Sequence, residues 1–313
     1  MARFVLRRLV GLAITLLLTS FLVFGAMHAA PGDPASFLLA GRTPSPEAVA
    51  AVRTQYHLDD PVLEQYVRWI GGAVTGDLGR SVQFRQEVRG LIAARLPTTL
   101  VLVAYASLIM VVGGLLLGFV SALRPGRVDR AVLFGTTVAV ATPSFVAAIA
   151  LISLFAVGLG WFPTFGAGAG VLGTLHHLTL PAIALGLSLV GLLARVTRAS
   201  MVEELRRDHV DMARLRGLPE STVVRRHVAR NALVPVVTIT GTIVSGLLVA
   251  TAIVETAFGL PGIGSMLVQS VVTRDFPVVQ AICLLVVLAF VLANLLVDLL
   301  LPILDPRTRA YAR

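Results

Sequence analysis

The side chains of this chain that could do chemistry are few, and most of them are arginines. All 26 basic residues are arginine, because the sequence contains no lysine. A P-loop that binds ATP needs its lysine on the phosphates, and this chain cannot supply one. If ATP energises the protein through a P-loop, another chain must bind the nucleotide.

The remaining reactive side chains form no catalytic or metal-binding pattern. The single cysteine, Cys283, lies in an apolar run, cannot form an intrachain disulfide and is expected to be a packing residue. His176 and His177 are adjacent, so on a helix they point about 100° apart and suit interface-level polar positions better than a shared metal. The sequence has no HExxH or GxSxG motif. We therefore expect no catalytic residue, no metal and no cofactor.

Nine of the arginines lie between Arg195 and Arg230. Within this stretch, "RASMVEELRRDHVDMARLRG" has a helix-forming pattern whose apolar side contains Val202, Leu205, Val210, Met212, Ala213 and Leu215. Gly217 is expected to end this helix as a C-terminal cap. Pro219 and Glu220 are expected to start the next helix, which continues through "STVVRRHVARNALVP". The pattern predicts a helix-turn-helix between two apolar runs.

The composition places this segment in a membrane protein. The chain has 313 residues, of which 56% are hydrophobic and 14% are charged, against about 25% charged in a soluble domain. About 20 apolar residues cross the hydrocarbon core as a helix, and Pro143 is expected to break or kink the long third run. Six such runs predict six transmembrane helices, at Leu9–Ala29, Thr98–Leu123, Ala131–Gly160, Leu178–Val196, Val236–Val254 and Val278–Leu301.

The distribution of arginines predicts the orientation. With the N-terminus in the cytoplasm, the inside segments hold 18 arginines and the outside segments hold 8, as the positive-inside rule requires. Both termini and the segment 197–232 would then be cytoplasmic. A cleaved signal peptide ending near "AMHAA" is the rival for the first run, but its apolar core is longer than such peptides usually have, which favours retention.

Two outside segments are long enough to have structure of their own. The segment Ala30–Pro97 predicts a small, partly helical cap, with a helix starting at Pro46 and Glu47 and a turn at "GDLGRSV". The segment Glu255–Pro277 is too broken to span and too apolar for an ordinary loop, so a re-entrant or surface-lying hairpin is expected. Neither segment is large enough for a catalytic domain.

A helix-turn-helix beside arginines could bind DNA or dock a cytoplasmic partner. Here the unit is tethered at both ends by membrane spans and has no third helix of its own, which disfavours nucleic acid. A short helix on a rigid turn, continuous with two spans, can instead transmit a push into both. The segment 197–232 is therefore interpreted as a docking site for a cytoplasmic partner.

Several motifs resemble those of ABC-importer permeases. "DMARLRG" followed by "RRHVARNALVPVVT" is similar to their EAA loop, although only Ala213 and Gly217 match the core in residue type. The likeness continues in "APGDPA", "GDLGRS", "RLPTTL", "ATPSFV", "TLPAIALGL" and "VETAFGLPGIGSMLVQSVVTRDFPVVQ". Taken in order along the chain, these motifs resemble the dipeptide, oligopeptide and nickel permease family, in its first, B-type membrane subunit.

The resemblance implies an all-α integral membrane protein with a type I ABC-importer permease fold. It would lie in the bacterial plasma membrane as one half of a heterodimeric pore. Its partners would be a second homologous permease subunit, cytoplasmic P-loop ATPase subunits and an external substrate-binding protein, with no nucleic acid and no enzymatic activity of its own. The parts would be 1–29 (tail and first span), 30–97 (cap), 98–301 (permease core, with the loop 197–232 and the hairpin 255–277) and 302–313 (tail).

The same resemblance implies which residues act. The coupling residues would be Asp211, Met212, Ala213, Arg214, Arg216, Gly217, Leu218, Pro219 and Glu220. Arg214 and Arg216 would pair with ATPase carboxylates or simply be solvated. Candidates for the translocation path are Thr142, Pro143, Ser144 and Asp298.

Two other functions compete with this reading. A secondary transporter or channel would need no ATPase, but the chain has few membrane-buried charges and no clear internal repeat. A membrane enzyme would need a catalytic motif that the sequence lacks. An ATP-driven importer subunit for peptides or a similar small solute is therefore the favoured function.

Overall fold

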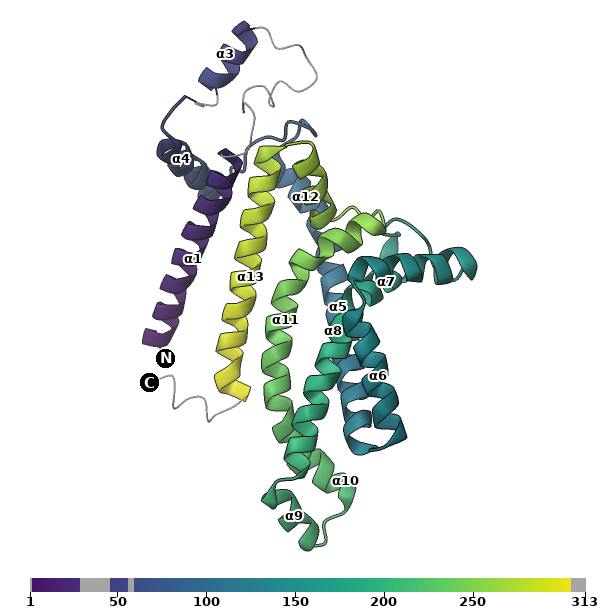
Figure 1. Cartoon of the computed structure of the whole chain (residues 1–313). Coiled ribbons are helices and arrows are strands. Elements are labelled where there is room, and N and C mark those ends of the chain that lie inside the picture. The colour runs from purple at the N-terminus through teal and green to yellow at the C-terminus, as the bar shows by residue number, and fades with distance from the viewer. Residues whose placement is uncertain (1, 29–45, 56–58, 305–313) are drawn as a thin grey trace. The chain divides into compact units, whose positions relative to one another are not determined.

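The computed structural model describes residues 2–28, 46–55 and 59–304, and these residues are helical apart from loops and one isolated bridge between Arg80 and Glu87. Figure 1 labels the elements along the chain. Their bounds are α1 (Ala2–His28), α3 (Pro46–Gln55), α4 (Val62–Thr75), α5 (Val88–Leu123), α6 (Arg127–Ala141), α7 (Ser144–Leu151), η1 (Ile152–Gly158), α8 (Gly170–Leu205), α9 (Asp208–Leu215), α10 (Glu220–Thr222), η2 (Val223–Ala229), α11 (Arg230–Ala257), α12 (Ile263–Val272) and α13 (Phe276–Leu304).

Four described helices are long and apolar enough to cross a membrane. They are α5, α8, the helix that runs from α10 through α11, and α13, and they contain the predicted runs Thr98–Leu123, Leu178–Val196 and Val236–Val254 and most of Val278–Leu301. The first predicted run corresponds to a shorter apolar stretch, Val10–Ala26 within α1. The count of six spans stays a prediction.

The third predicted run is broken, as Pro143 indicated. The helices α6 and α7–η1 pass the same length and hydropathy test together but are bent by 104°. Thr142 and Pro143 are extended, with ψ of 115° and 147°, and Pro143 has no N–H to continue the helix. If this pair counts as one span, the described chain has up to five.

The chain divides into two compact units. The first contains residues 1–97 and 262–291. In it α1 packs on α4, where the hydroxyls of Ser20 and Tyr66 are 2.8 Å apart and the rings of Phe24 and Trp69 stack at 5.7 Å. The predicted helix start at Pro46 is confirmed by α3.

A buried carboxylate holds the predicted "GDLGRSV" turn in the first unit. Asp275, which is 1% exposed, accepts hydrogen bonds from the hydroxyl of Ser81 and from the backbone N–H groups of Val82 (3.3 Å) and Gln83 (3.1 Å). The Ser81 hydroxyl in turn accepts from the N–H of Phe84 at 2.9 Å. The turn is thereby fixed to the residue that precedes α13.

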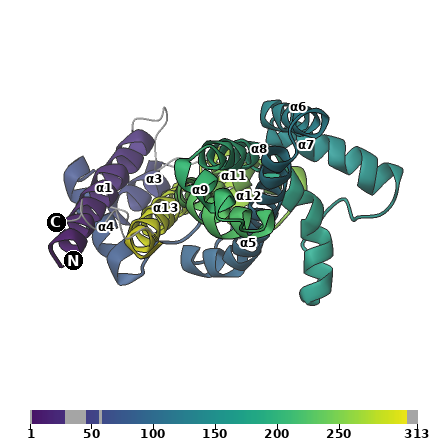
Figure 2. The same ribbon diagram turned by 90° about the horizontal axis from the view of Figure 1, so that it is seen from below.

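The second unit contains residues 98–261 and 292–313, and α8 is its central helix. Figures 1 and 2 show α11 along one side of α8 and α6 along the other. The approach of α5 to α8 requires glycine. A Cβ on Gly114 would meet Leu193 Cβ at 2.7 Å, and one on Gly118 would meet Thr197 Cβ at 2.5 Å and the Ala194 carbonyl at 2.8 Å. Small residues allow such close helix packing in membranes.

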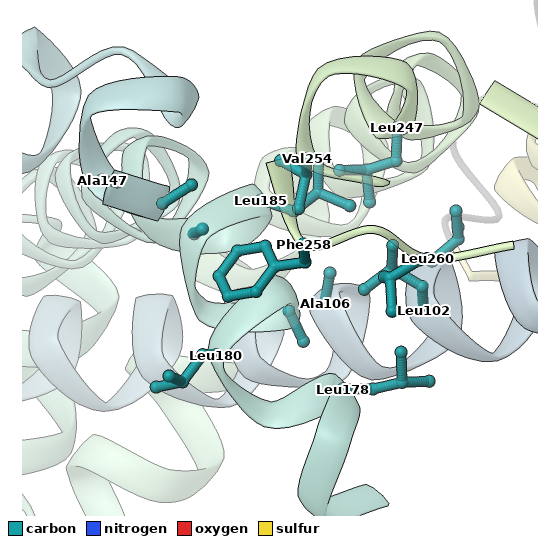
Figure 3. Close-up of a cluster of buried hydrophobic side chains, with 14 of the residues drawn as sticks. Leu102, Ala106, Ala147, Leu178, Leu180, Leu185, Leu247, Val254, Phe258 and Leu260 are labelled. Atoms are coloured by element: carbon teal, nitrogen blue, oxygen red, sulfur yellow. The ribbon is translucent and has the colours of Figure 1, made fainter. Parts of the chain in front are cut away.

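Three buried clusters follow α8 and α11 through the second unit. Near the end of α11, Phe258 and Leu260 pack with Leu102, Leu178 and Leu180 (Figure 3). The middle cluster contains Met110, Leu193 and Val236. The third cluster lies at the other end, where α8 meets α9 and η2, and contains Ala122, Met201, Val210, Ala213, Val223, Val228 and Ala232.

The close approach of α5 and α8 predicts a stability effect. Gly118→Ala should lower the free energy of unfolding by about 1–3 kcal/mol, because the added methyl group would clash with Thr197 and the Ala194 carbonyl of α8. Thermal unfolding of the purified chain in detergent measures this as a lower Tm. The control is Gly135→Ala in α6, whose Cβ would meet nothing within 4 Å; its Tm should be unchanged or slightly raised. Equal Tm values for the two variants would contradict the packing described here.

Candidate functional site

The predicted long helix of the arginine-rich segment is two helices. α8 ends at Leu205, Arg206 and Arg207 form a turn, and α9 begins at Asp208. The backbone of Arg207 is extended (φ −80°, ψ 140°), and Asp208 and Asp211 occupy the first turn of α9. Carboxylates at a helix N-terminus interact favourably with its dipole, which supports a new start at this position.

The break changes which side of the segment is buried. Val210 and Ala213 are buried, at 0% and 4% exposure, whereas Met212 and Leu215 are 51% and 80% exposed. The expectation that all four share an apolar side was therefore wrong for Met212 and Leu215. Because residues three apart share a helix face, Val210 and Ala213 face the third cluster while Met212 and Leu215 face outward.

Gly217 ends α9 as predicted. Its φ is +74°, in the left-handed region that favours glycine. Its N–H donates to the Arg214 carbonyl at 2.9 Å, and the N–H of Leu218 donates to the Ala213 carbonyl at 3.4 Å. This pair of bonds is the Schellman arrangement of a helix C-terminus. Residues 208–219, from the start of α9 to Pro219, are called the knuckle below.

The next helix starts where Pro219 and Glu220 predicted it. Pro219 is extended, and α10 (Glu220–Thr222) leads without interruption into η2 and α11. The π-helical turn of η2 was not predicted from the sequence. Figure 1 shows α9 and α10 beyond the ends of α8 and α11, so the knuckle lies where these two long helices meet.

One arginine of the knuckle, Arg214, pairs with a carboxylate inside the knuckle and with one directly after it. Arg214 donates to Glu220 at 2.9 and 3.2 Å and to Asp211 at 3.4 Å. The hydrogen bond to Glu220 is the main cause that raises the pKa of Arg214, and Asp211 adds to it. The same bond lowers the pKa of Glu220. Both residues lie in the polar segment before the apolar run Val236–Val254. Arg216 is exposed and has no ion-pair partner among the described residues.

The predicted coupling residues thus form one exposed element on a buried base. Met212, Leu215 and Leu218 give it an apolar outer surface, with exposures of 51%, 80% and 37%. Leu215 is absent from the predicted set, although its place one turn after Asp211 could have indicated it. The ion pair of Arg214 with Glu220 spans the turn at Gly217.

An ion pair joins α8 to α6 near the base of the knuckle. The guanidinium of Arg198 in α8 donates to both carboxylate oxygens of Asp129 in α6, at 2.6 and 2.7 Å, and Ser121 of α5 donates to the same carboxylate at 2.5 Å. Two-point arginine–carboxylate pairs fix orientation as well as distance. This contact joins residues from three helices, so no local sequence pattern indicates it.

The predicted translocation residues do not join the knuckle. Thr142, Pro143 and Ser144 lie together at the break between α6 and α7, where the Thr142 hydroxyl donates to the Val138 carbonyl at 2.8 Å. The side chain of Asp298 lies outside the described residues. Within the described ranges, no group of three or more His, Cys, Asp or Glu side chains could hold a metal ion.

Two family descriptions match this chain. Residues 114–310 match the binding-protein-dependent transport system inner membrane component, and residues 1–103 match the N-terminal region of membrane components of such systems. Together the two matches cover almost the whole chain.

Similar proteins include transport permeases. A protein of Brucella abortus (strain 2308) named as a peptide transport system permease is 41% identical over 99% of this chain and 99% of its own length. The glutathione transport system permease protein GsiC of Escherichia coli (strain K12) is 39% identical over 93% of this chain and 94% of its own. A crystal structure of an amino acid ABC transporter with histidines has a TM-score of 0.55 at 20% identity, and covers 68% of this chain and 93% of its own; this likeness concerns the fold alone.

The cap at Gly217 predicts a local stability effect. Gly217→Ala should destabilise α9 by about 1–2 kcal/mol, because an L-residue with a Cβ is strained in the left-handed region. The added Cβ would meet nothing within 4 Å, so the cost is conformational. Hydrogen exchange of the α9 amides should become faster by about fivefold or more. Gly217→Asn should recover part of the protection, since asparagine tolerates this conformation. Equal protection in wild type and Gly217→Ala would contradict the role of the cap.

Proposed function

The chain belongs to the family of binding-protein-dependent transport system inner membrane components, and from this premise we propose how it is coupled to its energy source. It is the permease component of an ABC importer of the peptide family. The proposal is that it forms half of the pore through which peptides or a similar small solute pass from an external binding protein to the cytoplasm.

The knuckle is the proposed contact with an ATPase subunit, and its exposed apolar residues are the observation that supports this. Met212, Leu215 and Leu218 face outward from an element whose exposed charged side chains are Asp208, Asp211, Arg214 and Arg216. Exposed apolar groups with a polar rim are typical of protein contacts. Arg214 pairs with Glu220 and Asp211 of its own chain, so in this proposal it shapes the turn, whereas Arg216 is available to an ATPase carboxylate.

ATP hydrolysis is assigned to the partner subunits. The chain has no lysine for a P-loop, so the nucleotide site lies on another polypeptide. When the ATPase subunits close, the knuckle would move with them. Because α8 and α11 are packed on the base of the knuckle, its displacement would reach both helices, and rocking of such packed helices is a known means of switching a transporter.

The topology is part of the same proposal. We place both termini and the segment 197–232 in the cytoplasm, on the arginine excess of 18 over 8. The cap 30–97 and the hairpin 255–277 are then external and would receive the binding protein. The second permease subunit would complete the pore beside the core 98–301, where Thr142, Pro143, Ser144 and Asp298 remain the candidates for the translocation path.

A charged residue on the outer surface of the knuckle should uncouple the importer. Leu215→Arg replaces a side chain that is 80% exposed, so the chain should fold with an unchanged Tm. An arginine in an apolar contact is costly to desolvate. The ATPase that copurifies with the tagged chain, identified by mass spectrometry, should fall at least tenfold, and ATP-driven uptake of labelled peptide into proteoliposomes should fall with it.

The matched control is Leu172→Arg, at the opposite end of α8, where the leucine is 84% exposed. This variant should keep its ATPase and its ATP-driven uptake. Wild-type coupling in the Leu215→Arg importer would contradict the proposed contact. A wild-type chain that transports peptide with no ATPase present would instead support the secondary transporter.

A further inference from the structure

A broad groove opens beside the knuckle, between the end of α8 and the helix formed by η2 and α11. Its volume is about 1360 Å³, larger than the roughly 300–1,000 Å³ of typical small-molecule pockets. Arginines 207, 225, 226 and 230 line it together with His209 and His227. This hollow is called the arginine groove.

The two walls of the arginine groove differ in charge balance. On the α8 wall, Glu203 accepts from Arg207 at 2.7 Å. Glu204 accepts from Asn231 at 2.9 Å and lies 3.2 Å from His209 and 3.6 Å from Arg207. The carboxylates of the groove are thus already occupied by groups of the same chain.

The opposite wall has arginines without such partners. Arg225, Arg226 and Arg230 are exposed, and within the part of the chain that the structure describes none of them makes an ion pair or a side-chain hydrogen bond. π-Helical hydrogen bonds join residues five apart, and such turns are frequent at functional sites. η2 contains Arg225 and Arg226, and Arg230 directly follows it, so one continuous helix supplies all three arginines to the groove.

Arginine forks of this kind match phosphate oxygens. A guanidinium presents several donors in a fixed plane and binds phosphate through two parallel hydrogen bonds. We propose that the arginine groove binds a phosphate group, and that the carrier of this phosphate is the headgroup of an anionic phospholipid. A soluble phosphate compound shares the chemistry and is the alternative carrier.

The lining and the depth of the groove favour the lipid. Val234 and Pro235 also line it, so the groove offers apolar side chains beside cationic ones, which matches an amphiphile better than a free anion. Arg230 lies six residues before the apolar run that starts at Val236, or about 9 Å at 1.5 Å per residue. The headgroup layer of a leaflet is about 5–7 Å thick, and a long arginine side chain bridges the difference. Basic pockets at this depth bind anionic headgroups in other membrane proteins.

The test compares two variants that lose the same charge. The groove variant is Arg225→Gln, Arg226→Gln and Arg230→Gln in the full-length chain. The control variant is Arg124→Gln, Arg127→Gln and Arg130→Gln, three exposed arginines in the turn after α5 and in the first turn of α6. Native mass spectrometry of the delipidated chain in detergent counts bound phosphatidylglycerol, phosphatidylcholine or inorganic phosphate during titration. Thermal unfolding checks that each variant is folded. If the triple groove variant does not fold, the single variant Arg230→Gln replaces it.

Wild type should bind phosphatidylglycerol more tightly than phosphatidylcholine. The groove variant should lose about tenfold or more of this affinity, whereas the control variant should lose much less. Equal losses in both variants would overturn the proposal, because they would show attraction to net charge and no site. The absence of any preference for phosphatidylglycerol in wild type would overturn it as well.

Two further outcomes separate the groove from other binding partners. If inorganic phosphate binds wild type but not the groove variant, and phosphatidylglycerol shows no such difference, the lipid carrier is overturned in favour of a soluble phosphate compound. The groove variant should copurify with its ATPase as wild type does. Loss of the ATPase with unchanged lipid binding would overturn the lipid site in favour of a protein contact, a result distinct from failure of the Leu215→Arg prediction.

Discussion

The structure of the knuckle depends on the packing of Val210 and Ala213 against Val223 and Val228. α9 has only eight residues, and isolated helices shorter than about 12–15 residues are marginal in water. Its persistence therefore requires tertiary contacts, and these come from the buried face that α9 turns toward Met201, Ala122 and the start of η2. Because the buried face is fixed, the outward direction of Met212 and Leu215 is fixed too.

Local signals in the sequence predicted the parts of this region that depend on local conformation. The cap at Gly217, the restart at Pro219 and the break at Pro143 all follow from the backbone restrictions of glycine and proline. The break after Leu205 was not predicted, because "EELRRDH" contains good helix formers and nothing that forbids a continuous helix. Which side of α9 is buried could not be predicted either, since the break resets the helical phase.

Contacts between residues far apart in the sequence could not be predicted from local sequence patterns. Ser81 and Asp275 are 194 residues apart, and Thr99 and Glu255 are 156 apart. The arginines illustrate the same limit. Their number predicts a cytoplasmic segment, but Arg198 pairs with Asp129, Arg214 pairs with Glu220, and Arg225 has no ion-pair partner among the described residues. Net charge counts paired and unpaired arginines alike. It could therefore indicate membrane orientation, but it could not tell which arginines are held in ion pairs and which are available to bind a ligand.

Long helices join the two ends of the second unit, as the proposed coupling requires. α11 has 28 residues, or about 42 Å at 1.5 Å per residue, and it leads from the base of the knuckle to the cluster around Phe258. At that far end the Thr99 hydroxyl donates to the buried carboxyl group of Glu255 at 2.6 Å. A buried carboxyl group is stable only when its hydrogen bonds are made, so this tie resists separation of α5 from α11. Interiors packed to the density of organic crystals transmit strain. A displacement applied to the knuckle would therefore be carried along α8 and α11 together.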